Sequence, residues 1–433
     1  MTRTLFGTDG VRGVAGEFLT AELALRLARA ATGRAGVDRP QVLIVRDTRE
    51  SGEMLECAVA AGVAAAGGRA LLGGVLPTPG APLLIARHGF DLGVVISASH
   101  NPYRDNGIKF FGGDGFKLSD ATELEIEALL RVAPAPGAGV GRVGPLHGAL
   151  EDYLRALEER FSGLDLTGRR IAVDCANGAT AWAAPEIFRR LGADVDVLFA
   201  APDGRNINAE CGSTHLAPLI AHVRAGGHEA GFALDGDGDR VLAVDSEGTV
   251  VDGDELIALG ALHRREPGVA VTVMTNFGFH TAMRDAGVEV ATTPVGDRYV
   301  LEALRERGWA LGGEQSGHII DMGFTPSGDG IAAALLTLES LEGGPLKERH
   351  AMEKLPQTLV NVRLRARGAL AEAPRVDAAI KAESAQLEGR GRVLVRPSGT
   401  EPLVRVMVEA PTAEEADAIC ARLVAVVERE AAT

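Results

Sequence analysis

Short apolar runs alternate along the chain with longer stretches of helical periodicity, and the alternation recurs as one repeated unit. Residues 42–79, 171–205 and 270–298 each carry an apolar run, a polar turn, a helical segment, a break of small residues, a second apolar run and a loop rich in Pro or Gly. Such β-turn-α-β units form parallel strands joined by right-handed crossovers. Three copies predict three related α/β domains.

The segments between these units predict the domain boundaries. Residues 133–145 are rich in Pro and Gly and are typical of a linker, and further breaks fall at 245–248 and 355–358. The pattern then changes to three short strands and one long closing helix, which predicts a smaller α+β domain. We therefore expect three related mixed or parallel-sheet α/β domains plus a C-terminal α+β domain around a central cleft. The expected domains are residues 1–145, 149–246, 248–356 and 359–433.

Composition and charge narrow the class of protein. The 433 residues are 46% hydrophobic and 24% charged, as in folded globular chains, and the net charge of −15 disfavours nucleic-acid binding. No apolar run reaches the ~18 residues of a membrane span, and the N-terminus lacks the apolar core of a signal peptide. We expect a cytoplasmic protein. The four cysteines form no C-x-x-C pair, so buried or indifferent thiols are expected.

The strongest chemical signal is the segment 231–241, GFALDGDGDRV. An apolar strand leads directly into Asp235, Asp237 and Asp239, which are separated only by glycines. Glycine allows the backbone to fold tightly, so the three carboxylates converge and repel one another. A hard divalent cation relieves that repulsion, and oxygen ligands without His or Cys favour Mg²⁺. Arg240 adds a fixed positive charge beside them.

A second signal is the segment 93–111, GVVISASHNPYRDNGIKFF. A buried strand ends in a polar turn that contains Ser99 and His100, and the next strand carries Lys109. The carboxyl ends of strands are where α/β folds place ligands. The turn is therefore a candidate for a nucleophilic or phosphorylated Ser99, with His100 and Lys109 managing charge. A plain Asn-Pro turn with capping hydroxyls is the alternative.

Three further segments carry candidate ligand-binding groups. In 392–406, a tight turn with Ser398, Gly399 and Thr400 is flanked by Arg396 and Arg405, which predicts a phosphate cradle, with a plain β-hairpin as the alternative. In 311–320, the residues Glu314, Ser316 and His318 alternate and would face one side of an extended strand, a mixture that suits sugar hydroxyls, with a core histidine as the alternative for His318. In 6–13, glycines free the backbone while Thr8 and Arg12 offer donors to an anion, with a plain N-terminal turn as the alternative.

Together these segments resemble the α-D-phosphohexomutase superfamily. The motifs FGTDGVRG, SASHNPYRDNGIKFF, DGDGDR, GGEQSGH and RPSGTEP occur in the family's order over essentially the whole chain. The form of the second motif resembles the bacterial phosphoglucosamine mutase branch more than the phosphomannomutase/phosphoglucomutase branch.

The resemblance implies roles for these residues. Ser99 would be a phosphoserine whose phosphate, with Asp235, Asp237 and Asp239, holds one Mg²⁺ per chain. Arg12, Lys109 and His318 would manage protons and charge near the transferred phosphoryl group, and Glu314 and Ser316 would bind sugar hydroxyls. Arg298, at the end of the third repeat, would help to orient the sugar. The non-reacting phosphate would be bound by Arg396, Ser398, Gly399, Thr400 and Arg405.

The implied activity interconverts glucosamine 6-phosphate and glucosamine 1-phosphate through a 1,6-bisphosphate, and so supplies amino-sugar nucleotide and cell-wall synthesis. Glucosamine 1,6-bisphosphate would also serve as activator, and a homodimer is the default expectation. The alternatives are mannose or glucose phosphate as substrate, a phosphatase with Asp235 as nucleophile, and a sugar-phosphate sensor without catalysis.

Overall fold

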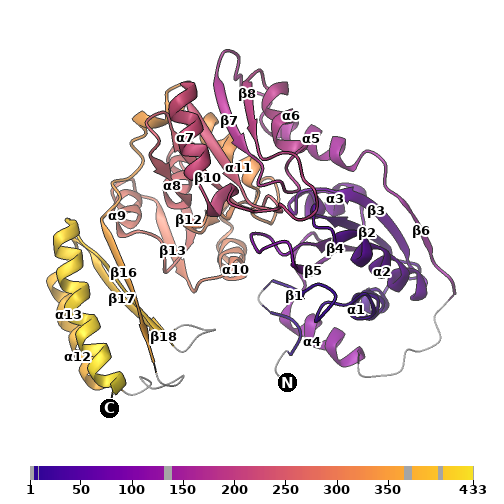
Figure 1. Ribbon diagram of the computed structural model, residues 1–433, viewed down its shortest axis with the longest axis horizontal. Helices are drawn as coiled ribbons and strands as arrows, with labels where there is room; N and C mark the ends of the chain where they lie inside the picture. The colour runs from indigo at the N-terminus through magenta and orange to yellow at the C-terminus, as the bar shows by residue number, and fades with distance from the viewer. Residues whose placement is uncertain (1–3, 8, 131–138, 365–372, 398–402, 433) are drawn as a thin grey trace. The chain divides into compact units, whose positions relative to one another are not determined.

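The computed structural model describes residues 4–7, 9–130, 139–364, 373–397 and 403–432, and Figure 1 shows its helices and strands. The described residues form four separate β-sheets of six, five, four and three strands. Internal contacts divide the chain into two compact units. The first contains Met1–Met274 and Val288–Arg349, and the second contains Thr275–Gly287 and His350–Thr433.

The six-stranded sheet has the order β1-β5-β4-β2-β3-β6. Its central strands β4, β2 and β3 are parallel, and β2 and β3 are the two strands of the first predicted repeat. Strand β5 runs antiparallel to β4. The strands are β1 (Val11–Val14), β2 (Gln41–Arg46), β3 (Arg69–Val75), β4 (Leu92–Ile96), β5 (Asp105–Gly112) and β6 (Arg142–Pro145). The helices are α1 (Ala21–Arg34), α2 (Gly52–Ala65), α3 (Gly80–His88) and α4 (Asp120–Leu129).

Strand β6 corrects one sequence-based expectation. We expected residues 133–145 to form a linker, but residues 142–145 pair in parallel with β3, and Arg142 lies opposite Arg69. The strand lies at the edge of the sheet. An edge position tolerates the glycine and proline that made the segment look like a linker, because one side of an edge strand needs no ladder hydrogen bonds.

The five-stranded sheet has the order β11-β10-β9-β7-β8. Its parallel pair β7 and β8 is the second predicted repeat, and β9 is parallel to β7. The turn at 245–248, where we expected a domain break, joins β10 to its antiparallel partner β11. The elements are α5 (Ala149–Arg160), β7 (Arg170–Asp174), α6 (Ala183–Arg190), β8 (Asp194–Leu198), η1 (Gly212–Thr214), α7 (Ala217–Gly226), β9 (Ala230–Leu234), β10 (Val241–Asp245) and β11 (Val250–Val251).

The four-stranded sheet has the order β13-β12-β14-β15, and its parallel pair β12 and β13 is the third predicted repeat. Helix α8 begins at a capping box in which Asp252 and Glu255 satisfy each other's backbone N–H groups. The elements are α8 (Gly253–Arg264), β12 (Gly268–Thr272), α9 (Phe277–Asp285), β13 (Glu289–Thr293), α10 (Asp297–Arg307), β14 (Leu311–Gly313), β15 (Ile319–Asp321), α11 (Gly330–Ser340) and η2 (Leu346–Glu348).

The second unit contains the C-terminal α+β domain together with α9. The three predicted strands and the closing helix are present, and α12 adds a helix between β16 and β17. The elements are β16 (Gln357–Arg363), α12 (Pro374–Gln386), β17 (Arg392–Pro397), β18 (Leu403–Glu409) and α13 (Ala413–Ala432).

Helix α9 is tied to this domain by specific contacts. The Asn276 side chain donates to the carbonyl of Leu355 and accepts from its N–H, both at 3.0 Å. The backbone N–H of Phe277 donates to Glu409 Oε2 at 2.8 Å. A Cβ on Gly278 would lie 1.8 Å from the carbonyl oxygen of Glu353, so only glycine allows this close approach.

The structure also describes the four cysteines and the apolarity of the helices. Cys175, Cys211 and Cys420 are buried and Cys57 is exposed, and none of the four forms a disulfide. Among the helices of the described ranges, none combines the length and apolarity needed to cross a bilayer.

Candidate active site

Ser99 lies in a strained, buried turn that follows β4. Its φ of 52° is in the left-handed region, which costs a non-glycine residue roughly 1–3 kcal/mol. Its backbone N–H donates to Ser97 Oγ at 2.9 Å, and its own hydroxyl donates to Asp235 Oδ2 at 2.6 Å. Nδ1 of His100 is 3.3 Å from the same hydroxyl. The turn therefore directs Ser99 toward the aspartate loop.

The guanidinium of Arg49 donates hydrogen bonds to the backbone of this turn and is completely buried. Its Nη2 donates to the carbonyls of Ser99 at 2.8 Å and Asn101 at 2.9 Å, and its Nη1 donates to the carbonyls of Pro102 and, at 2.9 Å, Asp105. Its Nε donates to Asp47 Oδ2 at 2.8 Å. One rigid, five-donor guanidinium thus fixes four backbone carbonyls of the segment 99–105 around the serine.

Asp47 in turn joins Arg49 to the hydroxyl that positions Ser99. Ser97 Oγ donates to Asp47 Oδ2 at 2.6 Å, and Ser97 Oγ accepts from the Ser99 N–H. Burial raises the pKa of Asp47, while the charge of Arg49 and these hydrogen bonds act in the opposite direction. Sequence analysis did not single out Asp47, Arg49 or Ser97. The available signal was the Asp-Thr-Arg sequence directly after β2, at the carboxyl edge of the same sheet.

The aspartate loop follows β9, and its three carboxylates converge as expected. One carboxylate oxygen of each of Asp235, Asp237 and Asp239 lies within 4.8 Å of the others, and all three residues are buried. A Cβ on Gly236 would lie 2.7 Å from the carbonyl oxygen of Ser99. The glycine is therefore needed for the loop to approach the serine turn, because any side chain would push the two apart.

Two of the carboxylates keep buried oxygens without hydrogen-bond partners. Asp237 Oδ1 and Asp239 Oδ1 have none within the described residues. Burial and the neighbouring charges of Asp239 and Asp237 raise the pKa of Asp235 well above its usual value. Buried oxygens that lack donors and carboxylates that repel one another are the conditions that a hard, oxygen-binding dication satisfies. The residues therefore fit a Mg²⁺ ion.

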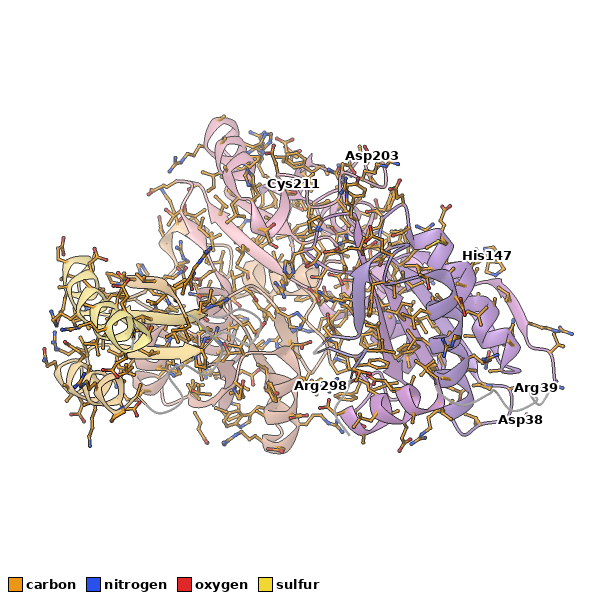
Figure 2. The ribbon with its side chains drawn as sticks, turned by 60° about the horizontal axis from the view of Figure 1, so that its bottom comes forward. Asp38, Arg39, His147, Asp203, Cys211 and Arg298 are labelled. Carbon is orange, nitrogen blue, oxygen red and sulfur yellow. The ribbon has the colours of Figure 1, made fainter. Side chains whose placement is uncertain are left out.

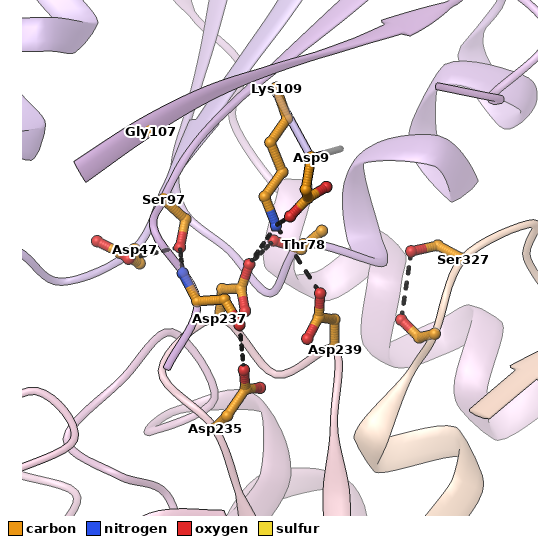
Figure 3. Close-up of polar contacts among 12 residues, drawn as sticks. Asp9, Asp47, Thr78, Ser97, Gly107, Lys109, Asp235, Asp237, Asp239 and Ser327 are labelled. Carbon is orange, nitrogen blue, oxygen red and sulfur yellow. Dashed lines mark hydrogen bonds and ion pairs between the residues drawn. The ribbon is translucent and has the colours of Figure 1, made fainter. Parts of the chain in front are cut away.

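Lys109 connects the aspartate loop to the N-terminal segment (Figure 3). It stands on β5 opposite Val95 of β4, and its Nζ lies 2.9 Å from Asp237 Oδ2 and 3.1 Å from Asp9 Oδ2. Thr78 Oγ1 also donates to Asp237 Oδ2, at 2.6 Å. Burial lowers the pKa of Lys109, but Asp237 and Asp9 outweigh burial and raise it above its usual value. Lys109 is thus a fixed positive charge.

Two arginines add positive charge at the edges of this cluster. Arg12 pairs with Asp9, and its pKa is raised by Asp9 and by Asp237 despite burial. Arg240 Nε lies 3.8 Å from Asp239 Oδ1, while its backbone N–H donates to Asp235 Oδ1 at 3.2 Å. Both guanidiniums remain partly accessible. They are therefore available to an anionic ligand beside the aspartates.

A second line of charges links His318 to the N-terminal segment. Lys117 Nζ pairs with both Asp9 and Asp297. His318 lies between two carboxylates, with Nδ1 3.6 Å from Asp239 Oδ2 and Nε2 3.7 Å from Asp297 Oδ2. Burial lowers the pKa of His318, but Asp239 and Asp297 together raise it above its usual value. Sequence analysis missed Asp9, Lys117 and Asp297, although Asp9 lies within a motif that it quoted.

The segment 311–320 corrects a second expectation. We expected Glu314, Ser316 and His318 to share one side of an extended strand, but β14 ends at Gly313 and β15 begins at Ile319. The residues between them form a turn closed by a hydrogen bond from Gly317 N to Glu314 O at 3.0 Å. Gly317 has a φ of 89°, a left-handed conformation that glycine adopts readily and that this turn uses. Glu314 and Ser316 remain neighbours within this turn, with Ser316 Oγ donating to Glu314 Oε2 at 3.4 Å.

Arg298, labelled in Figure 2, lies at the start of α10. Its guanidinium pairs with acidic residues of another segment. It forms ion pairs with Asp120 and Glu123 on α4 and donates to the carbonyl of Leu118. Arg298, Asp120 and Leu118 line part of a cavity of about 510 Å³. The contacts occupy the guanidinium that we expected to orient a sugar, and that role stays a prediction.

The second unit contains an unusual pair of cations. Arg396 on β17 lies directly opposite Arg405 on β18. Burial and the charge of Arg405 lower the pKa of Arg396, and Arg405 Nε is buried without a hydrogen-bond partner among the described residues. Like charges directly opposite one another destabilise a strand pair unless an anion joins them. Of the other residues expected in this cradle or at the N-terminus, Ser398, Gly399, Thr400 and Thr8 lie outside the described residues.

Comparisons with known proteins give one consistent result. Four models of the phosphoglucomutase/phosphomannomutase family match: α/β/α domain I at residues 3–134, domain II at 151–248, domain III at 252–359 and the C-terminal domain at 359–426. A phosphoglucosamine mutase of Moorella thermoacetica is 51% identical and covers 97% of this chain and 98% of its own length. One of Deinococcus deserti is 49% identical, with 98% of each chain covered.

Solved structures show the same fold. A phosphoglucomutase/phosphomannomutase family protein from Burkholderia thailandensis superimposes with a TM-score of 0.81 at 25% identity, over 98% of this chain and 96% of that one. The N-acetylphosphoglucosamine mutase of Aspergillus fumigatus, in complex with GlcNAc-6P and magnesium, gives a TM-score of 0.69 at 19% identity, over 99% of this chain and 96% of that one.

Proposed function

This chain belongs to the phosphoglucomutase/phosphomannomutase family, within the α-D-phosphohexomutases, and we propose that it interconverts glucosamine 6-phosphate and glucosamine 1-phosphate. The observation that carries the proposal is the 2.6 Å hydrogen bond from the Ser99 hydroxyl to Asp235, across two segments 136 residues apart. A serine oxygen at the edge of an acidic, oxygen-rich pocket suits a phosphoryl carrier, because the phosphoryl group and the carboxylates can share one cation.

The reaction then has two phosphoryl transfers. In the first, the bond between phosphorus and Ser99 Oγ breaks and the C1 oxygen of glucosamine 6-phosphate forms a new phosphate ester. The C1 hydroxyl loses its proton and Ser99 Oγ gains one. The resulting 1,6-bisphosphate turns end for end within the site. In the second, Ser99 Oγ takes the phosphoryl group from C6, the C6 oxygen gains a proton, and glucosamine 1-phosphate leaves. The same bisphosphate, added from outside, would load an unphosphorylated serine and so act as an activator.

The residues of the site divide this work by charge. Asp235, Asp237, Asp239 and the phosphate on Ser99 would hold Mg²⁺, which when bound supplies Lewis-acid neutralisation of the transferring phosphoryl oxygens. Lys109, Arg12 and Arg240 stabilise the same developing negative charge from the protein side. His100, 3.3 Å from the Ser99 hydroxyl, and His318 are the candidates for moving the proton.

The remaining candidates would bind the substrate away from the reacting phosphoryl group. Glu314 and Ser316, neighbours in one turn, would accept from and donate to sugar hydroxyls. Arg396 and Arg405, opposed on β17 and β18, would clamp the phosphate that is not reacting, together with Ser398, Gly399 and Thr400. Thr8, in the N-terminal segment, would offer a donor to an anionic group of the substrate. An anion between two opposed guanidiniums removes their mutual repulsion and gains bidentate hydrogen bonds.

The test combines kinetics with mass measurement. Ser99→Ala is expected to abolish turnover and to remove the one phosphoryl group that peptide mapping finds after incubation with glucosamine 1,6-bisphosphate. Ser162→Ala, at an exposed serine after α5, is the matched control and should keep both. A Ser99→Ala enzyme with near-normal turnover would refute the proposal. Comparison of kcat/KM among glucosamine, glucose and mannose phosphates decides the sugar.

Two other functions make different predictions. A phosphatase with Asp235 as nucleophile would form an acyl phosphate, which mild base removes, whereas phosphoserine survives acid. Both oxygens of Asp235 already accept hydrogen bonds, from Ser99 and from the Arg240 N–H, which favours a ligand-holding role. A sugar-phosphate sensor would bind substrate and give no product in a coupled assay.

We also propose that the enzyme acts in the cytoplasm on a small sugar phosphate, without nucleic-acid partners. Four unpaired cysteines fit a reducing compartment. A homodimer is the default for a soluble enzyme, and light scattering measures the oligomeric state. A nucleic-acid binding assay at several salt concentrations tests for nucleic-acid partners.

A further inference from the structure

A second cluster of metal-ligating side chains lies on the five-stranded sheet, on elements that do not carry the aspartate loop. Asp196 belongs to the edge strand β8, His222 to α7, and His228 to the turn between α7 and β9. One ligand atom of each lies within 4.8 Å of the other two. Three segments of the second α/β sheet therefore bring two imidazoles and one carboxylate to a common point.

The distances within the cluster are close to those of a coordination site. His222 Nε2 is 3.3 Å and His228 Nε2 is 2.7 Å from the same oxygen, Asp196 Oδ2. A tetrahedral ion with bonds of ~2.0–2.1 Å separates its ligand atoms by roughly 3.3 Å. The His222 distance matches this value, and a small shift of the Asp196 side chain brings His228 to it. The two rings lie side by side, with centroids 4.9 Å apart.

One ligand is fixed and the other two are accessible. The His228 side chain is 1% exposed, and a Cβ on Gly226 would lie 2.3 Å from its Cε1, so the ring packs directly against glycine. The side chains of His222 and Asp196 are 39% and 42% exposed. An ion can thus enter from solvent, reach a preset imidazole and keep an open coordination position.

One positive charge faces the same carboxylate. Arg170 Nη2 lies 3.4 Å from Asp196 Oδ2. The guanidinium has two other partners, the carbonyl of Gly226 at 2.6 Å and Asp194 at 3.5 Å. It can therefore keep these contacts when a cation takes its place at Asp196, but its charge weakens the binding of any cation.

We propose that Asp196, His222 and His228 bind a late first-row divalent transition-metal ion, of which Zn²⁺ is the type. Two imidazole nitrogens favour such ions over Mg²⁺ or Ca²⁺. Binding at His228 Nε2 places the ring proton on Nδ1, which is buried and has no hydrogen-bond partner in the described chain. The lack of such an outer partner costs ~10–100-fold in affinity, so we expect weaker binding than at a site whose histidines are both supported. The bound ion would tie α7 and its following turn to the edge strand.

The test uses Co²⁺ absorbance and Zn²⁺-dependent thermal unfolding of the full chain, with Mg²⁺ in excess to occupy the aspartate loop. The wild-type protein is expected to give a tetrahedral or five-coordinate Co²⁺ spectrum and a higher Tm with Zn²⁺. His222→Ala should weaken binding by roughly tenfold or more, because even the loss of an outer-sphere partner costs ~10–100-fold. Asp196→Asn, which keeps the side-chain volume, should do the same if His222→Ala folds poorly.

Two further variants separate this site from general surface binding. His147→Ala, at an exposed histidine before α5 (Figure 2), should bind as the wild type does. Arg170→Gln should bind more tightly, because it removes the competing cation. Equal binding by the wild type, His222→Ala and Asp196→Asn would overturn the proposal, as would weaker binding by Arg170→Gln.

Discussion

Removal of the Arg49 guanidinium should loosen the turn that presents Ser99 and leave a buried charge behind. Arg49→Met keeps most of the volume of the side chain but removes its hydrogen bonds to Asp47 and to the carbonyls of Ser99, Asn101, Pro102 and Asp105. Asp47 and Arg49 are both completely buried, so water cannot replace the lost partner without opening the fold.

The expected cost follows from that burial. Breaking a buried ion pair by removing one partner costs about 3–5 kcal/mol, against a total stability of about 5–15 kcal/mol for a typical domain. Urea unfolding measures the difference. Arg46→Met is the comparison variant, because Arg46 lies on the same strand but keeps part of its side chain in solvent. It pairs with the exposed Glu53 at 3.2 Å and the buried Glu56 at 3.3 Å, so its loss should cost less than the loss of Arg49.

The pH dependence of the deficit identifies its cause. Burial raises the pKa of Asp47 and Arg49 opposes the rise, so Arg49→Met should raise that pKa further. A carboxyl whose folded pKa is above its unfolded pKa is penalised when it ionises, and the penalty is complete above the folded pKa. The stability deficit should therefore be largest at neutral pH and shrink as pH falls through the folded pKa. The double variant Asp47→Asn/Arg49→Met should recover about 1–3 kcal/mol at pH 7.

The kinetic constants kcat and KM provide a second measurement. They separate a role of Arg49 in positioning Ser99 from a role in stability alone. Arg49→Lys keeps the charge near Asp47 but cannot reach four carbonyls, so the Ser99 turn should lose its fixed geometry. A displacement of about 1 Å at a reacting group costs on the order of 10²-fold in rate, so kcat should fall by about that factor while KM changes by less than about threefold. Wild-type kcat in a stable Arg49→Lys enzyme would refute the reasoning.

Three other outcomes are expected. Chelation of divalent ions should abolish turnover and be reversed by Mg²⁺, and activity that survives exhaustive chelation would contradict the proposed cation site. Glu127 accepts from the backbone N–H groups of Phe6, Leu5 and Thr4, which, against the effect of burial, lower its pKa to about 2. Glu127→Gln should therefore lower the free energy of unfolding by about 2 kcal/mol at pH 7. This loss is complete above the unfolded pKa and vanishes as pH falls toward 2. Urea unfolding measured over a range of acid pH values checks it. Arg405→Gln should raise KM by about tenfold, because it removes one phosphate contact. Stability should change little, because the substitution also removes one of two opposed positive charges. An unchanged KM would exclude Arg405 from the phosphate cradle.

The repeats and the catalytic segments were accessible from sequence because each depends on local chemistry. A β-run followed by a polar turn and a helix needs only its own residues, and the three parallel pairs appear where the pattern predicts them. The aspartate loop and the Ser99 turn were expected to share one Mg²⁺, because the ion needs a partner anion and a phosphorylated Ser99 can carry one. The two segments lie within hydrogen-bond distance of each other.

The rest depended on contacts between distant segments. Lys117 has no motif of its own, and its role as a link appears only when the fold brings Asp9 and Asp297 to it. Arg49 looked like an ordinary charged residue after a strand, because its carbonyl partners lie 50 to 56 residues away along the chain. β6 resembled a linker because its four residues are too few to show a periodic pattern. Only its pairing with β3 identifies it as a strand.

The attachment of α9 to the second unit has a consequence for recombination within this family. An exchange of residues 350–433 between two relatives would bring in a new three-stranded sheet but keep the host's own 275–287 segment, which must fit it through Asn276, Phe277 and Gly278. Functional chimaeras should therefore require both pieces from one parent, and the residues on either side of this seam should have evolved as a matched set.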